Sequence, residues 1–215
     1  MSEEFPKIIW QTHKWNYEDL PDIYKKTTLT WQIMNPDWEY RYIPNSRMRS
    51  YIDSLPPTVI QNFDNSVSAM NRSDIWREAI IYQHGGLWAD LDSICIFPID
   101  KVIEKNIDKE MICLPPVFKF GMDKNNNYEH ISTELAIQKI LNKEICEYWV
   151  SNAVFLGKKH NIISEEIFKS INGKWAFKER SFMSARAELH EKYYDIMSLE
   201  LICAMHEGRF NDRNY

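Results

Sequence analysis

Short strand-like runs alternate with helical stretches along the first half of this chain, and this alternation limits the possible folds more than any other feature. The predicted order is a strand at residues 7–11, a helix at 22–34, a strand at 39–43 and a helix at 46–55. The first run is β-branched and aromatic, and the second helix is expected to stop at Pro56 and Pro57. This order indicates an α/β domain.

The strongest helical pattern spans residues 66–84. Its apolar surface is expected to come from Val67, Met70, Ile75, Ile80 and Ile81. Gly85 and Gly86 follow and predict a left-handed stop, so they are explained by structure and given no ligand contact. Residues 87–92 then predict a short strand that carries two carboxylates at its end.

The second half of the chain is less strongly patterned. Further strands are predicted at residues 93–97, 111–114 and 149–156, with a polar loop at 121–132 and mostly helix from 161 onward. With 215 residues and 44% hydrophobic residues, the chain can bury one substantial core. We therefore expect a single domain over residues 1–215, with a helical carboxy-terminal part at about 161–215.

Charge and cysteine content narrow the function classes. The 26 basic and 31 acidic residues give a net charge of -5, which argues against a nucleic-acid-binding surface. The amino terminus has no basic segment followed by a long apolar run, so no signal peptide or membrane span is expected. Neither a zinc site nor a CxxC motif can be drawn from the widely spaced Cys95, Cys113, Cys146 and Cys203. We expect reduced core cysteines in a cytoplasmic protein.

Asp90 and Asp92 suggest chemistry most directly. In an extended segment, side chains two residues apart point to the same side, so both carboxylates can face one ion. Such oxygen ligands suit Mg²⁺ or Mn²⁺, with substrate phosphates and waters completing the octahedron. Taken alone, the tripeptide also fits a solvated turn.

The neighbourhood of these carboxylates is more specific. Residues 71–77 are Asn-Arg-Ser-Asp-Ile-Trp-Arg, and residues 82–92 are Tyr-Gln-His-Gly-Gly-Leu-Trp-Ala-Asp-Leu-Asp. They resemble the glycosyltransferases named for a sugar-binding region containing a DXD motif, a group that includes the yeast initiating α-1,6-mannosyltransferase. Large clostridial glucosylating toxins carry a similar block.

Two flanking segments extend this resemblance over residues 5 to about 157. Residues 5–12 resemble the family's opening strand, and residues 149–154 its Ser-Asn-Ala segment. The carboxy-terminal part matches poorly, because the family's frequent Gly-Ser-Trp ending is absent and only Met-His-Glu-Gly-Arg-Phe is found at residues 205–210.

The resemblance implies a GT-A fold, a Rossmann-like twisted mixed sheet flanked by helices, and transfer of a hexose with retention of configuration. It implies a UDP- or GDP-linked hexose as donor, Mn²⁺ or Mg²⁺ as cofactor, and a glycan, lipid-linked or protein hydroxyl as acceptor. Departure of a nucleoside diphosphate places negative charge on a phosphate oxygen, which a positioned cation stabilises. A pair of carboxylates that holds such a cation therefore fits this reaction.

The family pattern also implies roles for four residues around the metal. Asp90 and Asp92 would hold the ion, Asp74 would accept hydrogen bonds from sugar hydroxyls, and Arg77 would touch the sugar or the diphosphate. The alternative for Asp74 and Arg77 is an ordinary ion pair between positions i and i+3 of a helix.

The remaining candidates each have an equally simple structural explanation. We expect Trp10 to stack on the nucleobase, with Gln11 and Thr12 contacting the nucleoside; the alternative is a core tryptophan. Asn152 would bind the sugar or acceptor, or else form a buried turn. His206 would be a third metal ligand, or else a surface histidine.

Two other functions stay open at this point. A sugar-nucleotide hydrolase would keep the metal and the donor but pass the glycosyl group to water. A non-catalytic nucleotide-sugar or carbohydrate-binding module of a larger protein would have little need of the paired carboxylates.

Overall fold

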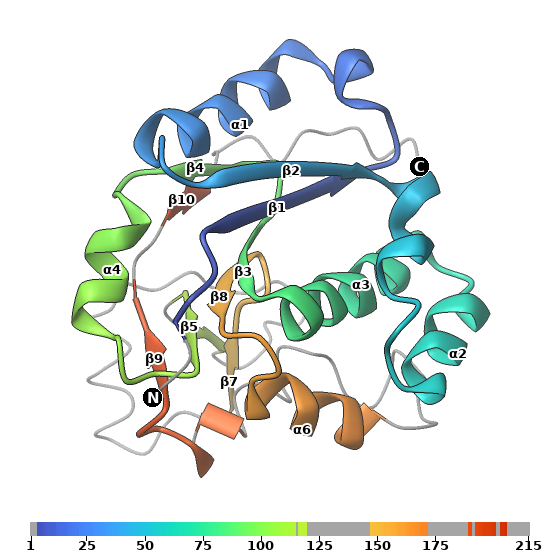
Figure 1. The fold of residues 1–215 in the computed structure, drawn as a ribbon, viewed down its shortest axis with the longest axis vertical. Coiled ribbons are helices and arrows are strands. Elements are labelled where there is room, and N and C mark those ends of the chain that lie inside the picture. The colour runs from blue at the N-terminus through green and yellow to red at the C-terminus, as the bar shows by residue number, and fades with distance from the viewer. Residues whose placement is uncertain are drawn as a thin grey trace, which may run out of the picture.

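A six-stranded mixed sheet forms the centre of the protein in a computed structural model that describes residues 4–114, 116–119, 147–171, 189–190, 192–200 and 203–205 (Figure 1). The strand order is β2-β1-β3-β8-β5-β9. The strands are β1 Ile8–His13, β2 Glu39–Pro44, β3 Gly86–Ala89, β5 Met111–Cys113, β8 Val154–Gly157 and β9 Met197–Leu199. All the pairings are parallel except those of β8, which runs antiparallel to β3 and β5.

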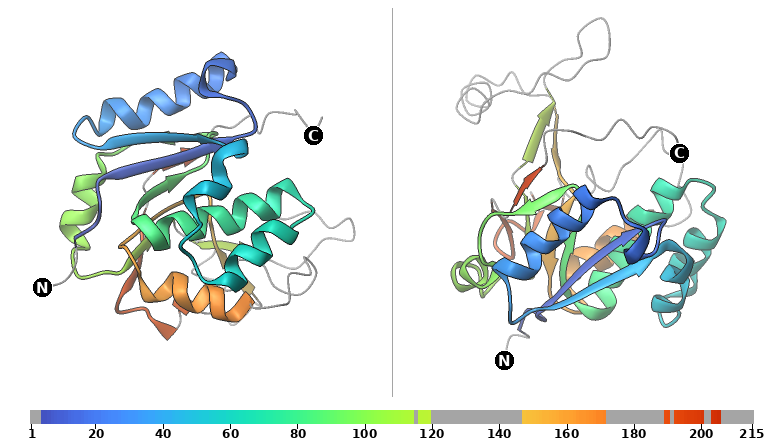
Figure 2. Two further views of the ribbon diagram at one scale, coloured as in Figure 1. Left: turned by 45° about the vertical axis from the view of Figure 1, so that its right-hand side comes forward. Right: turned by 90° about the horizontal axis from the view of Figure 1, so that it is seen from above.

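Helices cover both faces of this sheet, as two further views confirm (Figure 2). On one face lie α1 Asp22–Met34 and α4 Ile99–Lys105. On the other lie α2 Pro57–Asn65, α3 Ala69–His84 and α6 Ile162–Ile171, with the 3₁₀ helix η2 Asn45–Tyr51 beside them. A shorter 3₁₀ helix, η1 Tyr17–Asp19, precedes α1. Within the described ranges, no helix is both long and apolar enough to cross a bilayer.

Two small antiparallel pairs complete the described chain. β4 Ser93–Cys95 pairs with β10 Cys203–Met205, and β6 Pro116–Lys119 pairs with β7 Glu147–Val150. The first pair follows the end of β3 directly, so the chain leaves the central sheet at this point.

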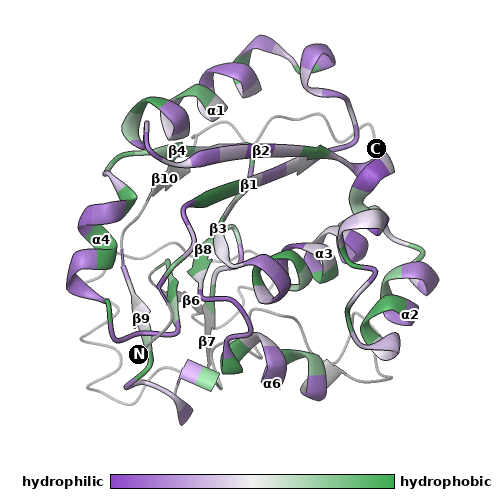
Figure 3. Cartoon of the chain, in the orientation of Figure 1, coloured by the Kyte–Doolittle hydropathy of each residue, from purple (hydrophilic) through white to green (hydrophobic). Residues whose placement is uncertain are grey.

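Two separate hydrophobic cores follow from the period-2 alternation of the strands. Ile9 and Leu87 face the core under α1 and α4, whereas their neighbours Trp10 and Trp88 face the core under α2, α3 and α6. Figure 3 shows the corresponding hydrophobic colour at the beginning of β1 and along β5 and β8. The predicted α/β class is confirmed.

Helix α3 differs from its predicted amphipathic form. It begins at Ala69 after the N-cap Ser68, and Val67 and Met70 are exposed, so these two residues do not contribute to the expected apolar surface. Residues 75–81 are buried all round, including the charged Arg77 and Glu78. Both buried charges have polar partners. Arg77 pairs with Asp90, just after β3, and the hydroxyl of Ser164 on α6 donates to Glu78 at 2.7 Å.

Two prolines begin a helix where the sequence predicted that one would stop. Residues 46–55 form mainly a 3₁₀ turn, and α2 starts directly at Pro57 with Pro56 as its N-cap residue. Proline is favoured at the first helical position because its missing N–H would have no partner there and its φ is already helical.

Strand predictions in the second half were correct in part. Residues 149–156 form not one strand but the end of β7 and most of β8, separated by residues 151–153. The helical expectation from residue 161 onward holds for α6 but is wrong for β9 and β10, whose three-residue strands depend on pairing with distant segments. The predicted loop at 121–132 lies outside the described residues. Cys95 and Cys113 are buried, as expected of core cysteines.

Gly85 and Gly86 turn the chain from α3 directly into β3. Gly85 has φ 67° and Gly86 has φ 98°, which other residues rarely adopt. A Cβ on Gly86 would lie 2.5 Å from the carbonyl oxygen of Ile8 on β1. The close turn sets α3 beside β3, and Nη1 of Arg77, near the middle of the helix, lies 3.1 Å from the carboxylate of Asp90, just past the carboxyl end of the strand.

We predict that Gly86→Ala destabilises the fold by at least about 1–3 kcal/mol, because a non-glycine residue is strained at this φ and its Cβ would also meet backbone. The measurement is the free energy of unfolding in urea. Gly157→Ala is the comparison: its Cβ would also meet a close atom, Cγ2 of the buried Ile81 at 2.6 Å, but its φ lies outside the left-handed region, so a larger loss in Gly86→Ala reports the strained backbone. An equal or smaller loss in Gly86→Ala would contradict this explanation of the turn.

Candidate functional site

The DXD segment forms a turn at the point where the chain leaves the central sheet. β3 ends at Ala89, and the N–H of Ser93 donates to the carbonyl of Asp90 at 3.1 Å. Along the segment, Ala89, Leu91 and Ser93 are buried, whereas Asp90 and Asp92 are partly exposed. The alternation predicted from i and i+2 spacing is therefore present, but in a turn rather than within a strand.

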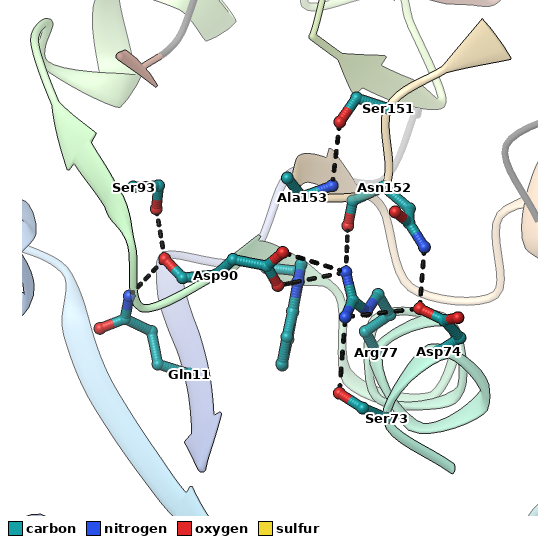
Figure 4. Close-up of polar contacts among 10 residues, drawn as sticks. Gln11, Ser73, Asp74, Arg77, Asp90, Ser93, Ser151, Asn152 and Ala153 are labelled. Atoms are coloured by element: carbon teal, nitrogen blue, oxygen red, sulfur yellow. Dashed lines mark hydrogen bonds and ion pairs between the residues drawn. The ribbon is translucent and has the colours of Figure 1, made fainter. Parts of the chain in front are cut away.

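Asp90 has a crowded and partly desolvated carboxylate. Its side chain is 28% exposed and accepts a hydrogen bond from Nε1 of Trp88 at 3.0 Å, and Nη1 of Arg77 lies 3.1 Å away (Figure 4). Burial raises the pKa of Asp90 to about 6, the positive charge of Arg77 opposes this shift, and the carboxylate of Asp92 adds to it. A cation placed beside these carboxylates would relieve both the desolvation and the repulsion.

Arg77 joins the polar groups of three segments. Its guanidinium donates to the carbonyl of Asn152 at 2.7 Å, pairs with Asp74 at 3.4 Å, and lies 5.0 Å from the centre of the Trp88 ring. The side chain is only 9% exposed. The alternative interpretation of Asp74 and Arg77, an i to i+3 ion pair, is therefore present, and Arg77 is an internal cross-link and not an open contact for a diphosphate.

The Ser-Asn-Ala segment, residues 151–153 between β7 and β8, packs against Arg77. The side-chain amide of Asn152 donates to Asp74 at 2.9 Å, and the N–H of Asp90 donates to the carbonyl of Ala153 at 2.8 Å. Figure 4 shows Asp74 and Arg77 from α3, Asp90 from the turn and Asn152 meeting in one place. These four predicted site residues come from three separate parts of the sequence and form one polar network.

Trp10 does not have the surface that stacking on a nucleobase needs. It is the third residue of β1, has no exposed area, and donates from Nε1 to the carbonyl of Gly85 at 2.9 Å. Its ring contacts Tyr51 and His84. The stacking expectation is corrected: because the strand continues to His13, Trp10 lies inside the core and not at a strand end.

Gln11 and Thr12 also act within the protein. The fully buried amide of Gln11 accepts from the hydroxyl of Tyr40 at 2.7 Å and donates to the carbonyl of Asp90 at 3.3 Å. The half-buried hydroxyl of Thr12 donates to the carbonyl of Ile43. Gln11 therefore supports the DXD turn instead of contacting a nucleoside.

Trp88 and His13, which the sequence pattern gave no role, border the turn. Trp88 lies two residues before Asp90, so the same alternation that pairs the two aspartates indicates that it points to their side. His13 ends β1, and its partly buried ring lies 4.6 Å from that of Trp15 and 5.5 Å from that of Tyr24. Burial lowers the pKa of His13. Tyr24 in turn packs against Leu91, so these aromatics lie beside the DXD turn.

The carboxylates present fit a divalent ion of the Mg²⁺ or Mn²⁺ type. Asp92 is half-buried, and among the described residues its carboxylate makes no hydrogen bond or ion pair. In the same part of the chain, no three His, Cys, Asp or Glu side chains gather around one point. Two carboxylates are enough for Mg²⁺, which leaves its other positions to phosphates and water. His206, the expected third ligand, lies outside the described residues.

The sequence profile of a known family matches this part of the chain. Residues 21–108 match the family described as "Glycosyltransferase sugar-binding region containing DXD motif". The matched residues include α1, α3 and the DXD turn. The resemblance identified from the sequence is confirmed.

Curated relatives show the same resemblance over a limited length. An initiation-specific α-1,6-mannosyltransferase of Candida albicans is 29% identical over 49% of this chain and 29% of its own length. Inositol phosphoceramide mannosyltransferase 2 of Schizosaccharomyces pombe is 30% identical over 46% of this chain and 28% of its own length. The aligned part of the chain thus spans less than a third of either relative.

Solved structures of toxin glycosyltransferases share the fold. PaToxG glycosyltransferase superposes with a TM-score of 0.58 at 14% identity, covering 89% of this chain and 71% of that structure. The ligand-free glycosyltransferase domain of the YGT toxin gives 0.53 at 10% identity, covering 94% and 81%. The expected GT-A fold is confirmed.

We predict that Trp10→Ala destabilises folding by about 3–5 kcal/mol, because it empties a fully buried site, and that donor affinity of the folded protein is unchanged. The measurements are urea unfolding and titration of a nucleotide sugar. Trp10→Phe is the milder control, since it keeps most of the ring. Weakened donor binding in a variant of normal stability would restore the stacking role.

Proposed function

We propose that this chain transfers a hexose from a nucleoside diphosphate sugar, UDP- or GDP-linked, to a hydroxyl group with retention of configuration, using Mn²⁺ or Mg²⁺ held at Asp90 and Asp92. The observation that carries the proposal is the network of Asp74, Arg77, Asp90 and Asn152 at the carboxyl end of β3, with Asp92 beside it and unpaired in the described chain. In open α/β sheets, ligands bind beyond the carboxyl ends of the strands.

The relatives support the reaction class and suggest where to begin with substrates. The fungal proteins are named as mannosyltransferases, one as an initiation-specific α-1,6-mannosyltransferase and two as inositol phosphoceramide mannosyltransferases. Mannose is therefore the first donor sugar to test. The acceptor hydroxyl belongs to a glycan, a lipid-linked molecule or a protein.

The chain's own residues divide the work within this proposal. A bound divalent ion would supply charge stabilisation to the departing diphosphate. Asp92 offers that ion a carboxylate with no partner among the described residues, while Arg77 and Trp88 hold the orientation of the Asp90 carboxylate. Asp74 is held by Asn152 and accepts hydrogen bonds from sugar hydroxyls. We propose that Trp15 and His13, whose rings contact each other beside the DXD turn, bind the base in place of Trp10.

The direct test is thermal unfolding with a panel of nucleotide sugars, GDP-mannose first, with Mn²⁺ and with EDTA. A ligand that binds the native state raises its melting temperature by mass action. The proposal expects a shift with at least one donor only when Mn²⁺ is present, followed by acceptor-dependent transfer. Release of free sugar that no acceptor increases would favour a hydrolase, and binding without turnover would favour a non-catalytic module.

We predict that Asp92→Asn lowers turnover by more than about 100-fold, because it removes a charge that binds the metal. The fold is expected to stay intact, since the side-chain volume hardly changes. Changes to residues that only support metal ligands commonly cost about 10–100-fold, and loss of a ligand itself is expected to cost more. The measurements are initial rates and Mn²⁺ affinity. Asp37→Asn, which removes an exposed carboxylate elsewhere, is the matched control. Wild-type turnover in Asp92→Asn would exclude a metal role for this residue.

We predict that Asp74→Ala weakens binding of the intact donor by about 1–3 kcal/mol for each sugar hydroxyl left unpaired, and leaves binding of the nucleoside diphosphate unchanged. Both affinities are measured in Mn²⁺. Ser73→Ala is the control, because it removes another contact of Arg77 from the same helix and leaves the carboxylate. Equal weakening of both ligands would show that Asp74 supports the metal or Arg77 and does not read the sugar.

A further inference from the structure

The backbone from Leu91 to Cys95 is hydrogen-bonded by the side chains of a helix. The hydroxyl of Thr27 donates to the carbonyl of Leu91, Nε1 of Trp31 donates to the carbonyl of Ser93 at 3.1 Å, and the N–H of Cys95 donates to the hydroxyl of Thr30 at 3.0 Å. All three partners lie on α1. They reach alternate residues of the segment, which are the positions where a neighbouring strand would normally bond.

Side chains take the place of a neighbouring strand here because of where the segment lies. β1 pairs with β3 at Leu87 and Trp88, and the following residues turn away from the sheet. Beyond the turn, β4 pairs with β10 along one edge. Buried backbone groups that lose their strand partners need others, and α1 supplies them.

Thr27 is the member of this set that reaches the DXD turn itself. Its side chain is buried, and it donates to the peptide carbonyl that lies between the two carboxylates. The hydroxyl has one hydrogen and a second acceptor in reach, the carbonyl of Tyr24 at 2.9 Å within α1. Leu91 is buried against Leu20 and Tyr24, so its carbonyl cannot turn freely to water.

The carbonyl of Asp90 is fixed in a similar way from the other side. Gln11 on β1 donates to it at 3.3 Å, and the backbone N–H of Ser93 donates to it at 3.1 Å. Both carbonyls between Asp90 and Asp92 are therefore restrained by groups other than the two carboxylates. Such outer groups commonly set how well metal ligands are oriented.

We propose that Thr27 is a positioning residue for the DXD turn, whose hydroxyl fixes the peptide between Leu91 and Asp92 and thereby sets the relative position of the two metal-binding carboxylates. This inference rests on the proposed function, because it assumes that Asp90 and Asp92 hold a divalent ion. It assigns to α1 a part in metal binding that neither the DXD motif nor its flanking residues indicate.

The test compares Thr27→Val with Thr27→Ser. Valine keeps the shape and removes the hydroxyl, whereas serine keeps the hydroxyl and removes a methyl group. Mn²⁺ is titrated into each variant and the wild type with saturating UDP, and separately GDP, while electron paramagnetic resonance measures free Mn²⁺. Thermal unfolding of each protein is recorded in EDTA.

Thr27→Val is expected to bind Mn²⁺ about 10-fold more weakly than the wild type, the lower end of what outer-shell changes commonly cost, and Thr27→Ser is expected to bind it normally. Equal Mn²⁺ affinity in wild type and Thr27→Val overturns the inference, and so does equal weakening in Thr27→Val and Thr27→Ser, since that would indicate a packing effect. If the wild type itself binds no Mn²⁺, the proposed function fails, and the inference fails with it.

A second variant keeps the test decisive if Thr27→Val does not fold. Thr27→Ala removes the hydroxyl together with the methyl group, and Thr27→Ser reports the loss of the methyl group alone. Thr27→Ala is therefore expected to bind Mn²⁺ about 10-fold more weakly than Thr27→Ser. Equal Mn²⁺ affinity in folded Thr27→Ala and Thr27→Ser overturns the inference in that case.

Discussion

The buried guanidinium of Arg77 is the contact on which the rest of the site depends. It pairs with Asp74 and Asp90 and donates to the backbone of Asn152, so one cation joins α3, the DXD turn and the segment before β8. Removing one partner of a buried ion pair typically costs about 3–5 kcal/mol, because the other charge is left without compensation. Without Arg77, the clustered carboxylates would repel one another in a desolvated place.

The fold brings these groups together through one tight turn and two layers of packing. The Gly85–Gly86 turn aligns α3 with β3, which places Arg77 against Asp90 although thirteen positions separate them in the sequence. Side chains from α1 and β1 then fix the turn from its other side. The groups around Arg77 thus carry an excess of negative charge, whereas the groups from α1 and β1 are neutral and hydrogen-bond the backbone of the turn.

The sequence predicted those parts that depend on local pattern. Periodicity located β1, β2 and α1 closely, and the DXD block was enough to single out Asp74, Arg77 and Asp90, which the fold brings into contact. The prediction for Trp10 was wrong because a residue's place along a strand depends on where that strand ends. Contacts between distant segments could not be predicted from local pattern either. Nothing in the sequence near Thr27 indicates that its hydroxyl meets the carbonyl of Leu91, sixty-four residues further along.

A crystal structure of the protein with Mn²⁺ and a nucleoside diphosphate, with the ion located by its anomalous scattering, tests the central claim most directly. The account predicts that the ion contacts the carboxylate of Asp92 and the diphosphate, while Arg77 still bridges Asp74 and Asp90. An ion bound away from this turn, or an Arg77 that has left both carboxylates to bind the phosphates, would contradict it.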